Sequence, residues 1–412
     1  MSVQEAPPSG PPIPAHVPQD LVRPEPVTLG APAGGLCPYS KLSALHDGPA
    51  TIFTPPNAGM MQTQGSWILT KAEDIREVLQ RPELFSSKGI AGFSRLVGES
   101  WDLIPLELDP PDHAKFRAVM NGIFAPKKIA AMEDGVRDRA VRLIEGLKEQ
   151  GDCEFMEAFG RPFPIAIFMQ LMGLPEKDFD KFVAWEHGLL HTTDFAARIA
   201  AGKAIYDYLR ELIAERRQTP AEDLTTFAIQ AVVDGRPTTD DEVMGICYLL
   251  VVAGLDTVAS ALGLQFRHLA QNPADQAKLR ADPSLIPGAI EEFLRRYATV
   301  TTSRFVTQDT AVGGVEMKAG DRVSCSTILA SLDPDEFGAP MDVDIERSPN
   351  RHVAFSYGPH RCIGSHLARR ELVIAMEEWL KRVPEFRVAD GVDVPVKPGG
   401  VWGVETLPLV WS

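Results

Sequence analysis

A single cysteine on a glycine-containing loop is the feature that most constrains this 412-residue chain. The loop reads Phe355-Ser-Tyr-Gly358-Pro-His360-Arg361-Cys362-Ile-Gly364 and runs at once into a helix-forming segment. A cysteine at the start of a helix faces unpaired backbone N–H groups and the positive end of the helix dipole, which lower its pKa and favour the thiolate. Gly358 and Gly364 let the backbone approach a flat ligand closely, and Phe355 offers an aromatic face beside the sulfur. A thiolate held in this way can serve as a ligand to a flat, metal-containing group.

Taken alone, Cys362 would be interpreted as an inert buried cysteine. The combination F-x-x-G-x-H-R-C-x-G is more specific, because six spaced positions must match. It resembles the haem-binding loop of the cytochrome P-450 family, in which the thiolate is the proximal ligand of the iron of haem b. The resemblance covers nearly the whole chain from about residue 40 and looks most similar to bacterial soluble enzymes of the camphor-hydroxylating type. It implies a mainly α fold for residues 37–412, one catalytic domain with a helix-rich core around the haem and small β-sheets at the margins.

The composition argues against several other classes of protein. A formal net charge of −15 disfavours nucleic acid or an anionic membrane as the main partner. The five cysteines lack CxxC or CxxH spacing, so neither a disulfide scaffold nor a zinc site is expected. The most apolar stretch, Ile246 to Leu255, is about half the length of a membrane span and fits a buried helix. Residues 1–36 are rich in Pro, Gly and Ala and lack the apolar centre of a signal peptide, so we expect a disordered segment and a cytoplasmic, monomeric protein.

Helical patterns dominate the rest of the chain. Thr239-Asp-Asp-Glu242 resembles a capping box and opens a long helical pattern that runs to about Gln271. The other expected helices cover 71–80, 109–124, 127–149, 177–189, 195–217, 222–233, 274–281, 285–297 and 362–383. Strands are expected at 65–70, 303–307, 312–317, 322–324 and in the tail after the last helix.

The long apolar helix carries an acid and an alcohol, Asp256 and Thr257, which are poor choices for a buried helix interior. One interpretation is structural: the threonine hydroxyl bonds the preceding turn and the aspartate pairs with a basic residue. The resemblance implies another, because the oxygen-binding helix of the family carries a small residue followed by an acid–threonine pair. On that interpretation Gly254 leaves room for dioxygen, Thr257 hydrogen-bonds it and Asp256 relays solvent protons.

Two further sets of residues follow from the resemblance. Glu292 and Arg295 share one helix face and correspond to a buried structural pair of the family, although this spacing alone usually marks a solvated surface pair. The haem propionates need cationic or donor partners. Four residues occupy matching positions, of which the first also fits an ordinary exposed basic face: His113, Arg117, Arg304 and His360.

The substrate pocket is where the chain departs from the camphor-hydroxylating type. Trp101 stands where those enzymes use a tyrosine hydroxyl to hold the substrate ketone, and Gly400 replaces a larger aliphatic residue. These changes favour a longer or flatter apolar substrate, such as a cyclic terpenoid or an ionone-like norisoprenoid. The candidate pocket residues, each equally plausible as plain core, are Trp101, Phe93, Leu249, Val252, Ala253, Val300 and Val401.

The resemblance implies a monooxygenase that uses dioxygen and receives electrons from a 2Fe-2S ferredoxin served by a flavin-dependent reductase. A basic patch on the Cys362 side is the expected docking surface, although these residues also fit scattered solvated charges: Arg76, Lys115, Arg117, Lys127, Lys128 and Arg361. Two alternatives stay open. One is a peroxide-driven peroxygenase, which the acid–threonine pair disfavours; the other is a non-catalytic haem-thiolate sensor.

Overall fold

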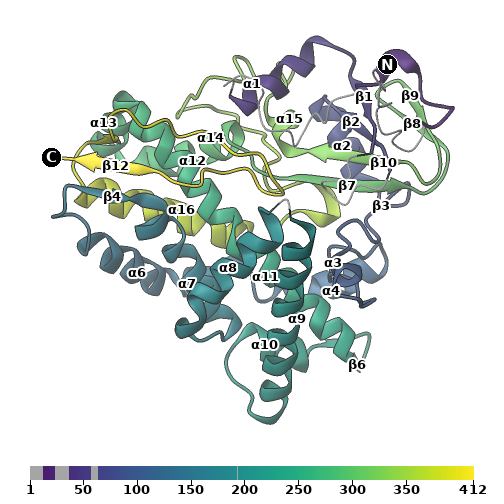
Figure 1. Cartoon of the computed structure of the whole chain (residues 1–412), viewed down its shortest axis with the longest axis horizontal. Coiled ribbons are helices and arrows are strands. Elements are labelled where there is room, and N and C mark those ends of the chain that lie inside the picture. The colour runs from purple at the N-terminus through teal and green to yellow at the C-terminus, as the bar shows by residue number, and fades with distance from the viewer. Residues whose placement is uncertain (1–12, 24–36, 57–63, 193) are drawn as a thin grey trace, which may run out of the picture.

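The computed structural model describes residues 13–23, 37–56, 64–192 and 194–412 (Figure 1). In the upper part of Figure 1, β1, β2 and β8 to β10 lie with α1, α2 and α15, whereas α6 to α11 lie lower and β4 and β12 lie at the left. The helices are α1 (Pro38–Ser43), α2 (Ala72–Gln80), α3 (Phe93–Leu96), α4 (Asp112–Asn121), α5 (Pro126–Ala130), α6 (Glu133–Glu145), α7 (Pro162–Met172), α8 (Phe179–Leu190), α9 (Phe195–Gln218), α10 (Leu224–Gln230), α11 (Asp240–Leu255), α12 (Thr257–Gln271), α13 (Pro273–Ala281), α14 (Ile286–Arg296), α15 (Thr327–Ser331) and α16 (Ser365–Arg382).

Small sheets complete the described part of the chain. The strands are β1 (Thr51–Thr54), β2 (Ser66–Leu69), β3 (Phe85–Ser86), β4 (Asp152–Glu154), β5 (Val232–Val233), β6 (Arg236–Pro237), β7 (Thr301–Val306), β8 (Thr310–Val312), β9 (Val315–Met317), β10 (Arg322–Ser326), β11 (Phe386–Val388) and β12 (Pro408–Trp411). Five of them form a sheet in the order β1-β2-β10-β7-β3, in which only the β2–β10 pair is parallel. Three more form the antiparallel sheet β11-β12-β4, and β5–β6 and β8–β9 are hairpins. This mainly helical architecture with small sheets is the predicted one.

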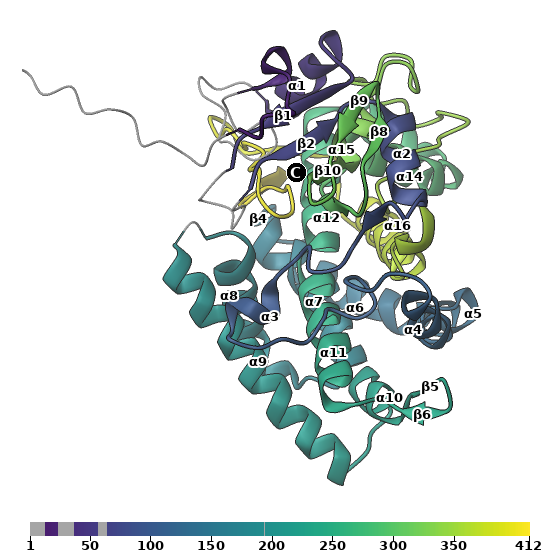
Figure 2. The same cartoon turned by 90° about the vertical axis from the view of Figure 1, so that its right-hand side faces the viewer.

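The paired helices α11 and α12 run through the middle of the molecule, between the strand-rich part and the α8–α9 hairpin (Figure 2). The capping box is present: Thr239 Oγ1 accepts from the Glu242 amide at 3.2 Å, and Glu242 Oε2 accepts from the Thr239 amide at 2.7 Å. The run from Asp240 to Gln271 is long and apolar enough to cross a membrane by length and composition, which exceeds the shorter stretch read from the sequence. Its most apolar window is 67% buried inside the fold, as in the core helix of a globular protein.

Two hydrophobic clusters meet along these central helices. One joins the five-stranded sheet, α14 and α16 around residues such as Trp67, Phe293 and Trp379. The other lies among α7 to α11 and includes Phe182 and Tyr248.

The structure corrects several expected element boundaries. The long helix is broken at Asp256, where α11 ends and α12 begins, and the expected helix 127–149 is two helices, α5 and α6. The sequence reading also missed α7, because its nearly continuous apolar run from Pro162 to Met172 shows no helical period.

The expected disorder of residues 1–36 falls mostly on residues outside the described part of the chain. The described segment 13–23 packs on the five-stranded sheet. Val17 is 3% exposed, and the Arg23 amide donates to the Phe53 carbonyl of β1 at 2.8 Å.

Candidate haem-thiolate active site

The Cys362 loop is held in one conformation by its own backbone and by α2. The Cys362 amide donates to the Phe355 carbonyl at 2.8 Å, closing the loop. Gly358 has φ +68°, and a Cβ at this position would lie 2.3 Å from the Leu79 carbonyl oxygen of α2. Only glycine combines that backbone angle with so close an approach. The glycine therefore seats the loop against α2, and α16 begins at Ser365, three residues after the cysteine.

The Cys362 side chain opens onto a cavity of about 490 Å³. The cavity is surrounded by protein, and this burial raises the pKa of the Cys362 thiol above its ordinary value, although the Gly364 N–H and the charges of Arg117 and Arg361 oppose the rise. The expected lowering of the pKa is therefore wrong for the protein atoms alone, because desolvation of a thiolate outweighs one N–H group and three nearby guanidinium groups. A thiolate at this place requires a bound metal ion that compensates its negative charge. The third of these groups, Arg369, lies 4.4 Å from the centre of the Phe355 ring.

The opposite wall of the cavity contains the break between α11 and α12. Thr257 lines the cavity, and its hydroxyl donates to the Ala253 carbonyl one turn earlier at 3.0 Å. Gly254 also lines the cavity, but a Cβ on it would lie 2.3 Å from the Phe168 ring, so close packing with α7 by itself requires glycine there. A side chain that takes the place of a helical backbone bond is a common cause of such breaks. The break thus presents a threonine oxygen to the space above the sulfur.

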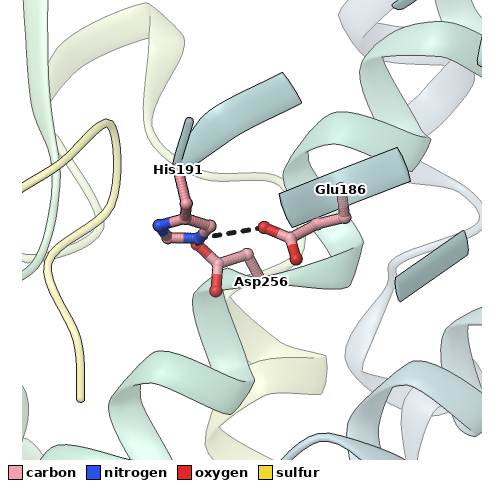
Figure 3. Close-up of side chains that lie close together, drawn as sticks. All are labelled: Glu186, His191 and Asp256. Carbon is pink, nitrogen blue, oxygen red and sulfur yellow. Dashed lines mark hydrogen bonds and ion pairs between the residues drawn. The ribbon is translucent and has the colours of Figure 1, made fainter. Parts of the chain in front are cut away.

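Asp256 turns away from the cavity into a cluster with Glu186 of α8 and His191, which directly follows α8 (Figure 3). His191 Nε2 lies 3.0 Å from Asp256 Oδ2 and 3.0 Å from Glu186 Oε1. The Ser260 hydroxyl donates to Asp256 Oδ1 at 2.9 Å. Burial lowers the pKa of His191, but its close contacts with the two carboxylates outweigh it and raise that pKa to about 10. Both contacts of the structural interpretation are therefore present: the threonine bonds its preceding turn, and the aspartate has a basic partner.

Three cationic or donor side chains, Arg117, Arg304 and His360, line the cavity, and His113 packs against His360. The His113 and His360 rings lie 4.1 Å apart, and His113 Nε2 is buried without a hydrogen-bond partner. Arg304 is 2% exposed and donates only to Thr302 and Ser303 of its own strand, β7. Arg117 donates to the Arg361 carbonyl at 2.6 Å. Neither Arg117 nor Arg304 has a carboxylate partner in the described ranges.

The charges of this cluster are arranged for an anionic ligand. Burial lowers the pKa of Arg304 and of Arg117. Burial, together with Arg304, His113 and Arg117, lowers the pKa of His360 to about 2. Buried cations without counter-ions are costly unless a ligand supplies the negative charge. The residues of this cavity therefore fit a haem. The imidazole without a hydrogen-bond partner and the two guanidinium groups without counter-ions suit the propionates, and the thiol of Cys362, which faces the cavity, suits the iron.

Glu292 and Arg295 form an ion pair with side chains that are 0% exposed, beneath this site. Glu292 also accepts from Arg347, Asn350 and the Asp344 amide, at 2.9 to 3.1 Å. Arg295 donates to three carbonyl groups, those of Ser331, Pro340 and Asp342. The pair thus fastens the irregular segment 338–350 to α14, and it does not line the cavity.

The structure brings only part of the predicted pocket to the cavity. Leu249, Ala253 and Val300 line it. Four other candidates are not among the lining residues: Trp101, Phe93, Val252 and Val401. The Trp101 ring stacks on Tyr206 and packs 4.9 Å from Tyr248, because the loop before α4 folds against α9 and α11 rather than over the cavity.

Several residues that shape the site were not found from the sequence. Phe168 lines the cavity from the unpredicted helix α7. Glu186 and His191 are five positions apart across the end of a helix, and this spacing has no helical or strand periodicity. They come close to Asp256 only in the folded chain. Glu371 of α16 lines the cavity with a pKa raised well above its ordinary value by burial.

Comparisons with known proteins agree with this geometry. The family model described as Cytochrome P450 matches residues 165–404. The "Probable cytochrome P450 127A1" of Sinorhizobium fredii is 41% identical over 409 residues, which cover 97% of each chain. Cytochrome P450 107B1 of Saccharopolyspora erythraea is 32% identical over 362 residues, covering 81% of this chain and 89% of the relative.

Two solved structures are similar over almost the whole fold. CYP101J2 has a TM-score of 0.85 at 33% identity and covers 98% of this chain and 100% of its own. CYP101C1 has a TM-score of 0.85 at 34% identity, with coverage of 97% and 100%. These similarities agree with the thiol on its closed loop, the cationic edge of the cavity and the broken helix opposite. The chain therefore belongs to the cytochrome P450 family and is a monooxygenase whose cofactor is haem b.

Proposed function

We propose that this monooxygenase hydroxylates a C–H bond of a small hydrophobic molecule, a cyclic terpenoid or an ionone-like norisoprenoid. The observation that carries the proposal is the cavity between Cys362 and Thr257, whose substrate-side wall is apolar: Phe168, Leu249, Ala253 and Val300. The same cavity of about 490 Å³ also takes the haem, so its apolar lining rather than its volume indicates the class of substrate. Trp101 is packed away from the cavity, so its indole N–H does not take over the role of a ketone-holding hydroxyl.

Different residues of the cavity would bind different parts of the haem. Cys362 would bind the iron through sulfur, and four side chains would hold the propionates: His113, Arg117, Arg304 and His360. When bound, the haem activates dioxygen for insertion into the substrate, with the thiolate donating electron density. Phe355 lines the cavity, and the Arg369 guanidinium lies over its ring. The apolar wall of the cavity would keep water from the substrate-facing side of the bound haem.

Two side chains at the helix break handle protons. The Thr257 hydroxyl already donates its hydrogen to Ala253, so its oxygen is left as a hydrogen-bond acceptor toward the cavity. Asp256 is 7% exposed and is held by His191 and Ser260 on the far side of the helix. For Asp256 to carry a proton to the cavity, its Oδ2 must leave His191 and turn past Thr257. Asp256→Asn should therefore slow turnover while leaving substrate binding unchanged.

A ferredoxin of the 2Fe-2S type, reduced by a flavin enzyme, is the proposed electron donor. The docking surface is narrower than the sequence suggested, because Arg76 pairs with Glu336 and Lys115 pairs with Asp112 and Asp234. Lys127 and Lys128 of α5 and Arg361 of the Cys362 loop are exposed without ion pairs in the described ranges. These three positive charges suit an acidic partner. We also propose that the enzyme works as a cytoplasmic monomer.

Lys128→Glu tests the docking surface. Its reduction by ferredoxin should slow at low salt, since charges near the docking site set the association rate. Lys381→Glu is the matched control, because Lys381 is also exposed and lies at the far end of α16, roughly 24 Å along the helix from Ser365. Equal effects of the two substitutions, or a reduction rate independent of salt, would contradict the proposed surface.

The substrate class is tested by titrating purified haem protein with β-ionone and with camphor while following the haem spin-state band. β-Ionone should give the fuller shift; a complete shift with camphor and none with ionone would show that the pocket argument is wrong. The reduced, CO-bound spectrum of Cys362→Ser tests the thiolate separately. An unchanged spectrum and unchanged oxidation in that variant would remove Cys362 from the site.

A further inference from the structure

Glu186, His191 and Asp256 bring two carboxylates and one imidazole to a single point (Figure 3). One ligand atom from each lies within 4.8 Å of the others. Glu186 comes from the last turn of α8, His191 follows α8, and Asp256 occupies the break between α11 and α12. The three segments meet only through the tertiary fold.

The cluster holds more negative charge than its histidine can satisfy. Glu186 and Asp256 are each 7% exposed. The single N–H at His191 Nε2 points at Asp256 Oδ2, so Glu186 Oε1, which is shielded from solvent, has no hydrogen-bond donor. A buried carboxylate oxygen without a donor is costly. The other cationic group near it is the exposed His187.

We propose that Glu186 Oε1, His191 Nε2 and Asp256 Oδ2 form a binding site for a divalent transition-metal ion of the zinc class. Imidazole nitrogen with two carboxylates suits Zn²⁺ and its neighbours, whereas Mg²⁺ and Ca²⁺ prefer oxygen alone. In a tetrahedral zinc site the ligand atoms lie about 3.3 Å apart. The observed separations of 3.0 Å from Nε2 to each oxygen therefore need to open by only a few tenths of an ångström. The ion takes the place of the proton on Nε2.

The surroundings supply the other features of a metal site. Ser260 donates to Asp256 Oδ1, which orients Oδ2 toward the site, as second partners of metal ligands do. His191 is exposed, so an ion enters from solvent past its ring, and water fills the fourth position. The spacing of the cysteines could not reveal this site, because its ligands are a histidine and two acids.

Binding there fastens the end of α8 to the central helices beside Thr257. It also occupies the oxygen of Asp256 that the proposed function needs for proton transfer. We therefore expect Zn²⁺ to inhibit turnover, a consequence that rests on the proposed function, whereas the binding itself does not.

The test uses the untagged haem protein, freed of other metals with a chelator. Isothermal titration with ZnCl₂ should show one equivalent of tight binding. Glu186→Gln and His191→Gln should each weaken it at least about tenfold. His187→Gln is the matched control and should bind like the wild type, since this neighbouring histidine is not in the ligand set. X-ray absorption at the zinc edge should show one nitrogen and two oxygens from the protein at about 2.0–2.2 Å.

Four outcomes would overturn the proposal: no one-equivalent binding, unchanged binding in both ligand variants, equal loss in His187→Gln, or full competition by Mg²⁺. The CO-bound spectrum of each variant shows that the fold and the haem site survive the substitution. Because titration and absorption do not depend on turnover, failure of the metal site is distinguishable from failure of the proposed function. Inhibition is then compared within each variant as the ratio of rates with and without Zn²⁺.

Discussion

Replacing Glu292 with glutamine should destabilise this protein more than most single substitutions. The carboxylate is 0% exposed and accepts hydrogen bonds from Arg295, Arg347, Asn350 and the Asp344 amide. Glutamine has nearly the same shape but carries no charge, and its NH₂ group would face these donors. Two guanidinium groups would lose their buried counter-ion. Breaking a buried ion pair from one side typically costs about 3–5 kcal/mol.

That cost translates into a measurable change in melting temperature. An unfolding entropy of about 2.1 cal/mol/K per residue gives about 0.9 kcal/mol/K for 412 residues. A loss of about 3–5 kcal/mol therefore lowers the melting temperature by about 3–6 °C. The melting curve of the haem protein is followed by far-ultraviolet circular dichroism, with haem absorbance recorded in the same scan.

Glu316→Gln is the control, because Glu316 is exposed on β9 and has no ion pair in the described residues. Its melting temperature should stay within about 1 °C of the wild type. A Glu292→Gln protein that melts with the wild type would refute the argument that the buried pair fastens segment 338–350. Arg295→Lys gives an independent reading, since lysine keeps the charge but loses the fork of hydrogen bonds to three carbonyl groups.

Two further predictions concern backbone and pH. Gly358→Ala should destabilise the haem protein by more than about 2 kcal/mol in urea unfolding, because its φ of +68° and the Leu79 carbonyl 2.3 Å from the new Cβ both oppose it; Gly135→Ala, where a Cβ meets nothing within 4 Å, should instead add about 0.5–1 kcal/mol, and the reverse order would contradict the reasoning. Burial opposes ionisation of Glu291, but its hydrogen bonds to Arg369 and His352 outweigh this effect and lower the pKa of Glu291 from 4.5 to about 2. The charged form therefore contributes at most about 3 kcal/mol above pH 4.5, and this is lost as the pH falls toward 2. The stability difference between wild type and Glu291→Gln should shrink over that range, and a constant difference would disprove the assignment.

The sequence determined the class of protein because its chemistry is local. A cysteine, two glycines and a histidine within ten residues set the conformation of one loop, and the loop needs no distant partner to be recognised. The capping box at Thr239 likewise predicts a helix start from four consecutive residues. The helix-rich fold with small sheets follows from such local signals along the whole chain.

Tertiary structure decided what each of those residues does. Burial, which no short segment controls, reverses the expected pKa direction of Cys362, because the thiol is enclosed by segments far apart in sequence. Tertiary packing also places the Trp101 ring against Tyr206 and Tyr248, away from the cavity.

The same distinction explains the cluster around Asp256. Its position beside Thr257 on the central helix was expected from the acid–threonine pair, but neither the break in the helix nor its partners were. Glu186 and His191 lie about 65 positions away and reach it only because α8 folds back over α11. Local chemistry is written in neighbouring residues, whereas charge pairing and desolvation depend on distances that exist only after the chain has packed.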